Sequence, residues 1–174
     1  MTYYALILDA NGNGIGQHSY VEEPAAYPAN EIACTQAQAQ TPAAWTVVNG
    51  SLVQSLTYAK AAQSALIKQG FANANAANIS FTDAAGVTDT YQADPTSVAD
   101  LNNCLSAFRA AAAVPSGFYW RSATNNNNAF TYADLVNLAA ALANRGFANF
   151  AQLQTLKANV MAATTVSDVQ AVVW

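Results

Sequence analysis

The chain has 174 residues, enough for one domain or two small ones. Hydrophobic residues make up 53% of it, charged residues only 9%, and the formal net charge is −4 at pH 7. The six basic residues are spread along the whole chain, so no concentrated basic face is expected. This pattern argues against nucleic-acid binding and against a basic membrane-surface patch, because both need clustered positive charge.

The sequence predicts neither export nor membrane insertion. The residues up to Asp9 lack a basic segment, so no signal peptide is predicted, and no apolar run approaches the ~20 residues of a membrane span. Cys34 and Cys104 stand far apart, which favours buried small side chains over a disulfide or a metal pair. A surface rich in neutral amide and small side chains does not repel copies of itself, which favours a place inside an assembly; the alternative is the compositional bias of an alanine-rich genome.

Residues 1–53 are predicted to form a small β-rich module. Its first hairpin joins a strand over Tyr3–Leu8 to a returning strand over Ile15–Val21. Asn and Gly residues in Asp9–Gly14 supply the positive φ angles of the tight turn between them. Glu31–Cys34 is predicted to be a further short strand.

A second hairpin is predicted to close the module. The dipeptide Asn49-Gly50, a strong hairpin signal, lies between the expected strands Trp45–Val48 and Ser51–Val53. After this hairpin the apolar spacing becomes helical. The sequence therefore predicts a second domain, mainly helical, over residues 54–174.

The helical domain is predicted to begin with a helix and a hairpin. Apolar spacing indicates a helix over Thr57–Gln69 that ends at Gly70, a residue suited to the left-handed end of a helix. Residues 73–78 are expected to form a loop. Period-two alternation then predicts a β-hairpin over about residues 79–91.

A second helix and a second hairpin are expected next. Asp94 followed by Pro95 is typical of a helix start, and Pro115 is expected to close that helix. The aromatic segment starting at Phe118 and the segment ending at Phe130 flank an asparagine-rich turn, so a hairpin is predicted over about residues 118–130.

The chain is predicted to finish with three helices. Thr131 and Asp134 have the spacing of a capping box at the start of a helix that ends at Gly146. The apolar residues from Phe150 to Val160 indicate another helix, and Thr165 with Asp168 opens a last short one. Taken together, these elements predict an α+β fold, with a small β-rich unit before a mainly helical domain that carries two hairpins.

Residues suited to catalysis or metal binding are few, so no catalytic residue, cofactor or metal is predicted. His18 is the only histidine, and the sequence suggests no partner for it, so a half-exposed strand position is the favoured interpretation. The Asp9–Gly14 turn resembles the opening of a calcium loop, but Tyr20 occupies the position of the required glutamate. Glu22 and Glu23 are interpreted as solvated, and Asp94, Asp134 and Asp168 as helix caps.

An aromatic and asparagine-rich segment is the one candidate contact site. Aromatic rings together with amides can bind sugars or a protein partner. A core aromatic strand with a solvated turn is the alternative, because alternate residues of a strand face inward. The candidate contact residues are Tyr119, Trp120, Asn125, Asn126, Asn127 and Asn128.

Several short motifs occur in order between about Leu56 and Trp174. They are Phe118-Tyr119-Trp120-Arg121, Asn125-Asn126-Asn127, Phe130-Thr131-Tyr132-Ala133-Asp134-Leu135, Leu156-Lys157-Ala158 and Ala162-Ala163-Thr164-Thr165-Val166. This part of the chain resembles a known family, the domain of unknown function at the C-terminal ends of tailed-bacteriophage tail-fibre and tail-fibre-assembly proteins. More loosely, Asp9–Gly14 and Trp45–Val53 resemble the N-terminal module of the same phage proteins.

The resemblance implies a phage or prophage tail protein that is structural or assists assembly, found in the virion or in the host cytoplasm during assembly. Its expected partners are a tail-fibre or baseplate protein, and self-association as a trimer is a further expectation. The alternatives are a receptor-recognition module for host-surface glycans and, less favoured, a glycan-active enzyme.

Overall fold

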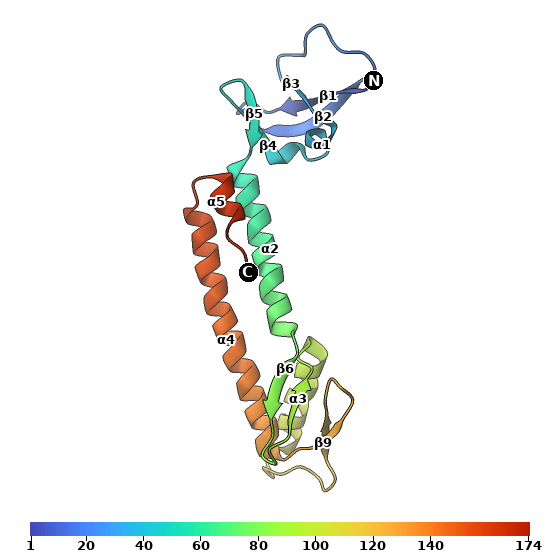
Figure 1. The fold of residues 1–174 in the computed structure, drawn as a ribbon, viewed down its shortest axis with the longest axis vertical. Coiled ribbons are helices and arrows are strands. Elements are labelled where there is room, and N and C mark those ends of the chain that lie inside the picture. The colour runs from blue at the N-terminus through green and yellow to red at the C-terminus, as the bar shows by residue number, and fades with distance from the viewer. The chain divides into compact units, whose positions relative to one another are not determined.

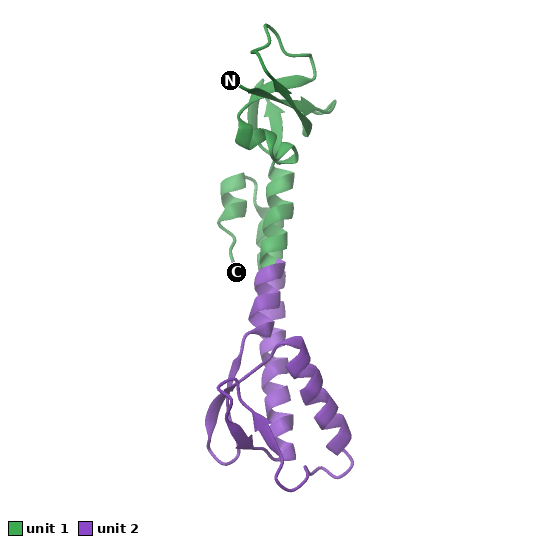
Figure 2. Ribbon diagram, turned by 90° about the vertical axis from the view of Figure 1, so that its right-hand side faces the viewer, with its two compact units in different colours: residues 1–67, 156–173 green, residues 68–155, 174 purple.

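The computed structural model describes residues 1–174 and has an α+β architecture, as the sequence predicts (Figure 1). The chain divides into two compact units (Figure 2): residues 1–67 with 156–173 form unit 1, and residues 68–155 with Trp174 form unit 2. This division falls inside the two long helices, α2 (Leu56–Ala76) and α4 (Tyr132–Ala162). Because this division does not test the domain boundary predicted after residue 53, that boundary stays a prediction.

A three-stranded antiparallel sheet in the order β2-β1-β3 begins unit 1. Its strands confirm the prediction and are β1 (Tyr3–Leu8), β2 (Gly14–Tyr20) and β3 (Glu31–Cys34). Asp9 tightens the turn between β1 and β2, because its Oδ1 accepts hydrogen bonds from the backbone N–H groups of Asn11 and Asn13, both at 2.8 Å. The short helix α1 (Gln36–Ala39) packs against β1, whose central side chains are buried.

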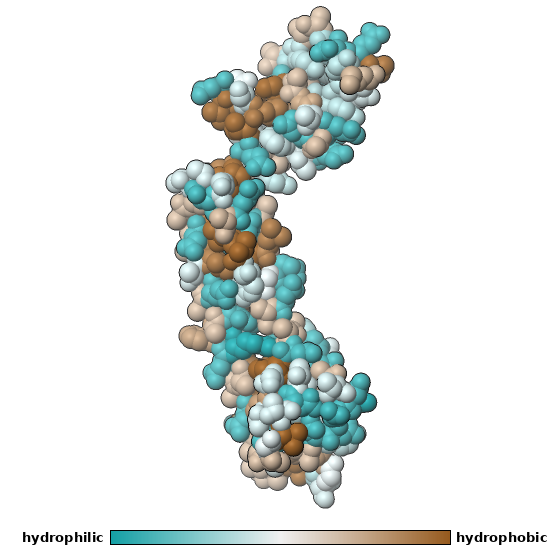
Figure 3. Space-filling model, in the orientation of Figure 1, coloured by the Kyte–Doolittle hydropathy of each residue, from teal (hydrophilic) through white to brown (hydrophobic).

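The second predicted hairpin is also present in unit 1. After a short 3₁₀ turn, η1 (Pro42–Ala44), β4 (Trp45–Val48) pairs with β5 (Ser51–Gln54). Asn49 and Gly50 both have positive φ, at 51° and 77°, which is the conformation that this two-residue turn requires. Figure 3 shows apolar side chains gathered over this hairpin, where Val48 and Val53 are exposed.

Helical contacts complete unit 1. Lys60 donates a hydrogen bond to the carbonyl oxygen of Met161 at 2.8 Å, so a cation stands at the C-terminal end of α4, where the helix dipole favours it. The amide of Gln63 donates to the carbonyl of Val172 at 2.6 Å. The last helix, α5 (Val166–Gln170), starts as predicted with Thr165 as its N-cap.

Unit 2 contains the two other predicted hairpins. The first joins β6 (Ile79–Thr82) to β7 (Thr88–Tyr91), and the second joins β8 (Tyr119–Arg121) to β9 (Asn127–Ala129). Between the hairpins lies α3 (Pro95–Phe108), which starts as predicted. It ends well before Pro115, so that part of the prediction is wrong.

The core of unit 2 lies between the hairpins, α3 and the start of α4. Its buried residues are Tyr91, Leu101, Phe130, Leu135 and Leu138. The ring centroids of Tyr91 and Phe130 are 5.2 Å apart. The predicted capping box of α4 is confirmed: Thr131 N–H donates to Asp134 Oδ2 at 2.8 Å, and Asp134 N–H donates to Thr131 Oγ1 at 3.2 Å.

The prediction that α2 ends at Gly70 is wrong, and so is the predicted loop over residues 73–78. The helix continues to Ala76. A Cβ atom at Gly70 would lie 2.5 Å from Cγ of Trp174, so this glycine makes room for the indole instead of ending the helix. Arg145 donates hydrogen bonds to the carbonyl group of Asn75, in the last turn of α2, and to that of Ala77, directly after the helix.

The two helices predicted on either side of Gly146 form one continuous helix, α4. A glycine inside a helix costs only about 1 kcal/mol relative to alanine. The surrounding Ala- and Leu-rich turns, which have high helix propensity, can offset that cost. Although α4 has 31 residues, neither it nor any other helix combines the length and apolarity needed to span a membrane.

Candidate interaction surfaces

The β8–β9 hairpin carries the candidate contact residues, and the carboxylate of Asp89 on β7 fixes its position. Asp89 Oδ2 accepts hydrogen bonds from the side-chain amides of Asn126 and Asn128, both at 3.1 Å. Asp89 Oδ1 accepts from the hydroxyl of Thr124 at 3.1 Å. The amide donors, Asn126 first and Asn128 next, hold the pKa of Asp89 well below its ordinary value. The carboxylate therefore stays ionised and keeps attracting the asparagine side chains.

Other hydrogen bonds reinforce this attachment. The Asn128 amide also donates to the hydroxyl of Tyr91, at 2.8 Å, and the backbone N–H of Ala123 donates to the carbonyl of Thr90 at 2.8 Å. Asn125 lies in the turn between β8 and β9 and has a positive φ angle of 67°. Asn127, on β9, has an exposed side chain and takes no part in these hydrogen bonds. Two of the four asparagines, Asn126 and Asn128, therefore join the hairpin to β7.

The two aromatic candidates face different environments. Trp120 is half-buried and packs against the core, with its ring centroid 6.4 Å from that of Phe118. Tyr119 is 53% exposed. Successive residues of a strand point to opposite faces, so the strand gives one aromatic ring to the core and one to the surface.

Tyr119 and Trp120 help to line a small pocket of about 290 Å³. The residues that complete it are Gln92, Ser97, Asp100 and Arg121. An aromatic surface thus stands beside an amide, a hydroxyl, a carboxylate and a guanidinium group. Such a set can make hydrogen bonds and stacking contacts with a protein segment or with a sugar. The structure brings this strand segment together with Gln92, Ser97 and Asp100, three residues that the sequence interpretation did not connect to it.

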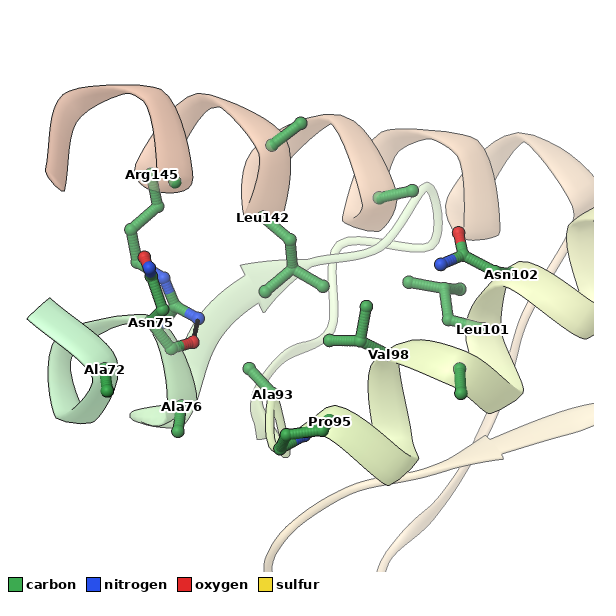
Figure 4. A pocket seen from close by; sticks show the side chains of 14 residues that line it. Ala72, Asn75, Ala76, Ala93, Pro95, Val98, Leu101, Asn102, Leu142 and Arg145 are labelled. Atoms are coloured by element: carbon green, nitrogen blue, oxygen red, sulfur yellow. Dashed lines mark hydrogen bonds between the residues drawn. The ribbon is translucent and has the colours of Figure 1, made fainter. Parts of the chain in front are cut away.

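A larger apolar groove of about 720 Å³ lies elsewhere in unit 2, between the end of α2, α3 and α4 (Figure 4). Its walls come from small and aliphatic side chains at helical spacing. On α3 these are Pro95, Val98 and Ala99, with the polar Asn102 in the same row, and on α4 they are Ala139, Leu142, Ala143 and Gly146. Sequence reasoning missed the groove, although the same i, i+3, i+4, i+7 row of mostly small residues in both helices was a readable signal.

Arg145 and Asn75 stand at one end of this groove (Figure 4). The Arg145 guanidinium donates to the carbonyl of Ala77 at 2.6 Å and to that of Asn75. Asn149 donates to Asn75 Oδ1 at 2.8 Å. Burial lowers the pKa of Arg145. These contacts satisfy carbonyl groups at the C-terminal end of α2 and make this end of the groove polar.

The residues considered for catalysis or metal binding have structural surroundings. His18 lies on the exposed side of β2 with its Nδ1 3.0 Å from Glu31 Oε1, and Tyr20 donates a hydrogen bond to the same carboxylate. The hydrogen bond to Glu31 raises the pKa of Tyr20 to about 12. Both cysteines are free and partly buried, and burial raises the pKa of each thiol. Nowhere do three His, Cys, Asp or Glu side chains gather as a metal-binding group.

A protein-family model, described as a domain of unknown function (DUF4376), matches residues 55–173. The match includes both hairpins of unit 2, the pocket beside Tyr119 and the apolar groove. No curated protein and no solved structure matches the chain.

Proposed function

The chain belongs to the DUF4376 family, and we propose that it is a phage or prophage tail-associated structural or assembly protein that acts through contacts with tail-fibre or baseplate components. The family match itself names no activity. The phage context comes from the sequence motifs that resemble the C-terminal domain of tail-fibre and tail-fibre-assembly proteins. In this proposal the protein works in the virion tail or in the host cytoplasm during assembly.

The observation that carries the contact role is the Tyr119-Trp120-Arg121 segment on a fixed hairpin. Tyrosine, tryptophan and arginine are the side chains most enriched among residues that dominate protein–protein binding energy. Here they follow one another on β8, beside a pocket of about 290 Å³. Each side chain can contribute contact area and, at its tip, a hydrogen bond.

The attachment of the hairpin to β7 supports the same role. A surface already held in its binding conformation loses less conformational entropy when a partner binds. Asp89 supplies that order through its hydrogen bonds to Asn126 and Asn128. The asparagine turn thus contributes to binding by holding the aromatic strand in place.

Co-expression with the products of neighbouring tail genes tests the proposal. We expect a stoichiometric complex by light scattering, and Tyr119→Ala should weaken it by roughly tenfold or more, as truncation of a contact residue worth about 1.4 kcal/mol or more does. Tyr58→Ala, which removes another exposed tyrosine from a different surface, should leave the affinity unchanged. The proposal fails if no tail protein forms a complex, or if both substitutions act equally.

The same pocket favours a second candidate function, recognition of a host-surface glycan. Stacking on Tyr119 and hydrogen bonds to Gln92, Ser97 and Asp100 suit sugar hydroxyl groups. Binding of host polysaccharide that Tyr119→Ala abolishes, without any tail-protein complex, would replace the first proposal by this one. Tyr119 is a better position to substitute than Trp120. Trp120 also packs against the core, so its substitution would change stability as well as binding.

A further inference from the structure

The outer face of α4 carries an apolar stripe that nothing in unit 2 covers. Its six residues are exposed and alternate between spacings of four and three, the heptad spacing of a coiled-coil seam. Phe147 is 77% exposed and Phe150 is 52% exposed. In order, the stripe consists of the apolar residues Val136, Ala140, Ala143, Phe147 and Phe150, with the uncharged polar residue Gln154 at its end.

The glycine at position 146 of α4, next to Phe147, is a second and independent sign that another molecule packs on this face. A glycine inside a helix lowers stability by about 1 kcal/mol relative to alanine. At Gly70 the cost has a packing reason inside the chain, whereas no atom lies within 4 Å of the position of a Cβ at Gly146. The missing side chain leaves space next to Phe147, and a large side chain of another molecule can pack into that space. Small residues serve the same purpose at other close helix contacts.

The charge distribution favours a second copy of this chain as the occupant. Between Leu135 and Leu156, Arg145 is the only charged residue, and its guanidinium group is hydrogen-bonded to the end of α2. The stripe is therefore neutral throughout. Two identical neutral faces meet without repulsion and without a charge to desolvate.

The order of large and small residues along the stripe determines how two copies fit. Antiparallel helices pair each residue with one at the mirrored position, so Phe147 can face Ala143 and Phe150 can face Ala140. Val136 then faces Gln154. Every large side chain thus meets a small or flexible one, and the two helix axes keep a constant separation.

We propose that the chain forms an antiparallel dimer in which the α4 stripes of two copies pack together, with Phe147 of each copy against Ala143 of the other. Ala143 also belongs to the wall of the apolar groove, so Phe147 of the second copy reaches the rim of that groove. A parallel arrangement would stack Phe on Phe and Ala on Ala, and one helix separation cannot suit both kinds of layer. This inference concerns a surface other than Tyr119-Trp120-Arg121, and it does not depend on the proposed function.

The area of the contact sets the strength that we expect. A phenylalanine buries about 200 Å² when fully covered, so the exposed parts of Phe147 and Phe150 supply on the order of 250 Å² per copy. A standard interface uses about 800 Å² per partner. The other stripe residues and the groove rim must supply the remainder. We therefore expect a dimer that dissociates on dilution.

Sedimentation equilibrium of the full chain tests the association. The wild-type protein should approach twice the chain mass as its concentration rises. Phe147→Glu should shift the protein to a monomer at the same concentrations, with an unchanged far-ultraviolet circular dichroism spectrum. Ala148→Glu, which places the same charge at an exposed position of α4 outside the stripe, should leave the dimer intact. A monomer or a trimer for the wild type, or equal loss in both variants, would overturn the proposal.

Distances between spin labels test the direction of packing, with Cys34 and Cys104 replaced by alanine. The proposed register centres on residue 145, so labels at Asn144→Cys should lie close together. Labels at Asn137→Cys should be separated by about 24 Å along the helices, from the rise of 1.5 Å per residue. Both positions are exposed on α4 beside the stripe. Short distances at both positions would indicate parallel helices and would contradict the proposal.

Discussion

At the residue scale, Asp89 is the residue that holds the β8–β9 hairpin in place, because three side chains of that hairpin donate hydrogen bonds to it. Thr124, Asn126 and Asn128 all donate hydrogen bonds to its carboxylate. Each of these bonds is charge-assisted only while the carboxylate is ionised. The position of the Tyr119 surface is therefore linked to the protonation of one aspartate.

This link predicts a pH dependence. The pKa of Asp89 is lower in the folded chain than in the unfolded chain, so its contribution to stability is fully present above the unfolded value, about 3.9. The contribution is lost as the pH falls below that value toward the folded pKa. Asp89→Asn should therefore lower the thermal midpoint at pH 7, and the difference from wild type should shrink as the pH falls toward 3. A difference that stays constant across this range would show that ionisation of Asp89 plays no part.

The candidate site was predictable only where its partners are close in sequence. The alternation along the strand was enough to predict that one of Tyr119 and Trp120 faces the core and the other the solvent. The role of Asn126 and Asn128 was not predictable, because Asp89 lies 37 and 39 residues away from them. A run of asparagines looks the same in a sequence whether its amides meet solvent or a carboxylate.

At the element scale, hairpins were easier to predict than helix ends. The turn of each hairpin is determined locally, as by the positive φ of Asn49 and Gly50. The ends of α2 and α4 are determined by residues far along the chain. Gly70 looked like a helix end but accommodates Trp174, and the true end of α2 is fixed by Arg145. Glycine signals a helix end only where no distant side chain uses the space that it leaves.

The packing of Trp174 on α2 predicts an unusual effect of Gly70→Ala. Inside a helix this substitution would ordinarily raise the free energy of unfolding by about 1 kcal/mol. Here the new methyl group would lie 2.5 Å from Trp174 Cγ, so we expect a loss of about 1–3 kcal/mol, as for other overpacked sites. In a Trp174→Gly background, which also removes the Cβ of residue 174 that lies 2.6 Å from the same point, the substitution should become stabilising. Chemical denaturation of the four proteins measures both effects, and stabilisation in both backgrounds would mean that Trp174 does not pack on Gly70.

At the scale of the whole molecule, the family match and the compact units describe different divisions of the chain. The match begins at residue 55, close to the boundary expected from the sequence. The compact units instead divide inside α2 and α4. These findings concern different properties, because a family match follows sequence similarity and a compact unit follows spatial contacts. Only folding of a fragment shows which boundary separates independent parts.

A fragment of residues 55–174 should fold without the N-terminal strands. The core that holds the hairpins of unit 2 to α3 and α4 uses only residues between Ile79 and Leu142, all of them within the fragment. The contacts of Gln63 with Val172 and of Lys60 with Met161 also lie within the fragment. We therefore expect a cooperative thermal transition and strong helical circular dichroism, with some loss of stability because the hydrogen bond from Ser55 N–H to the Ala44 carbonyl is removed. A fragment with no cooperative transition would show that the β-rich module is required for folding. The boundary predicted from the sequence would then mark a change of composition within a single folding unit.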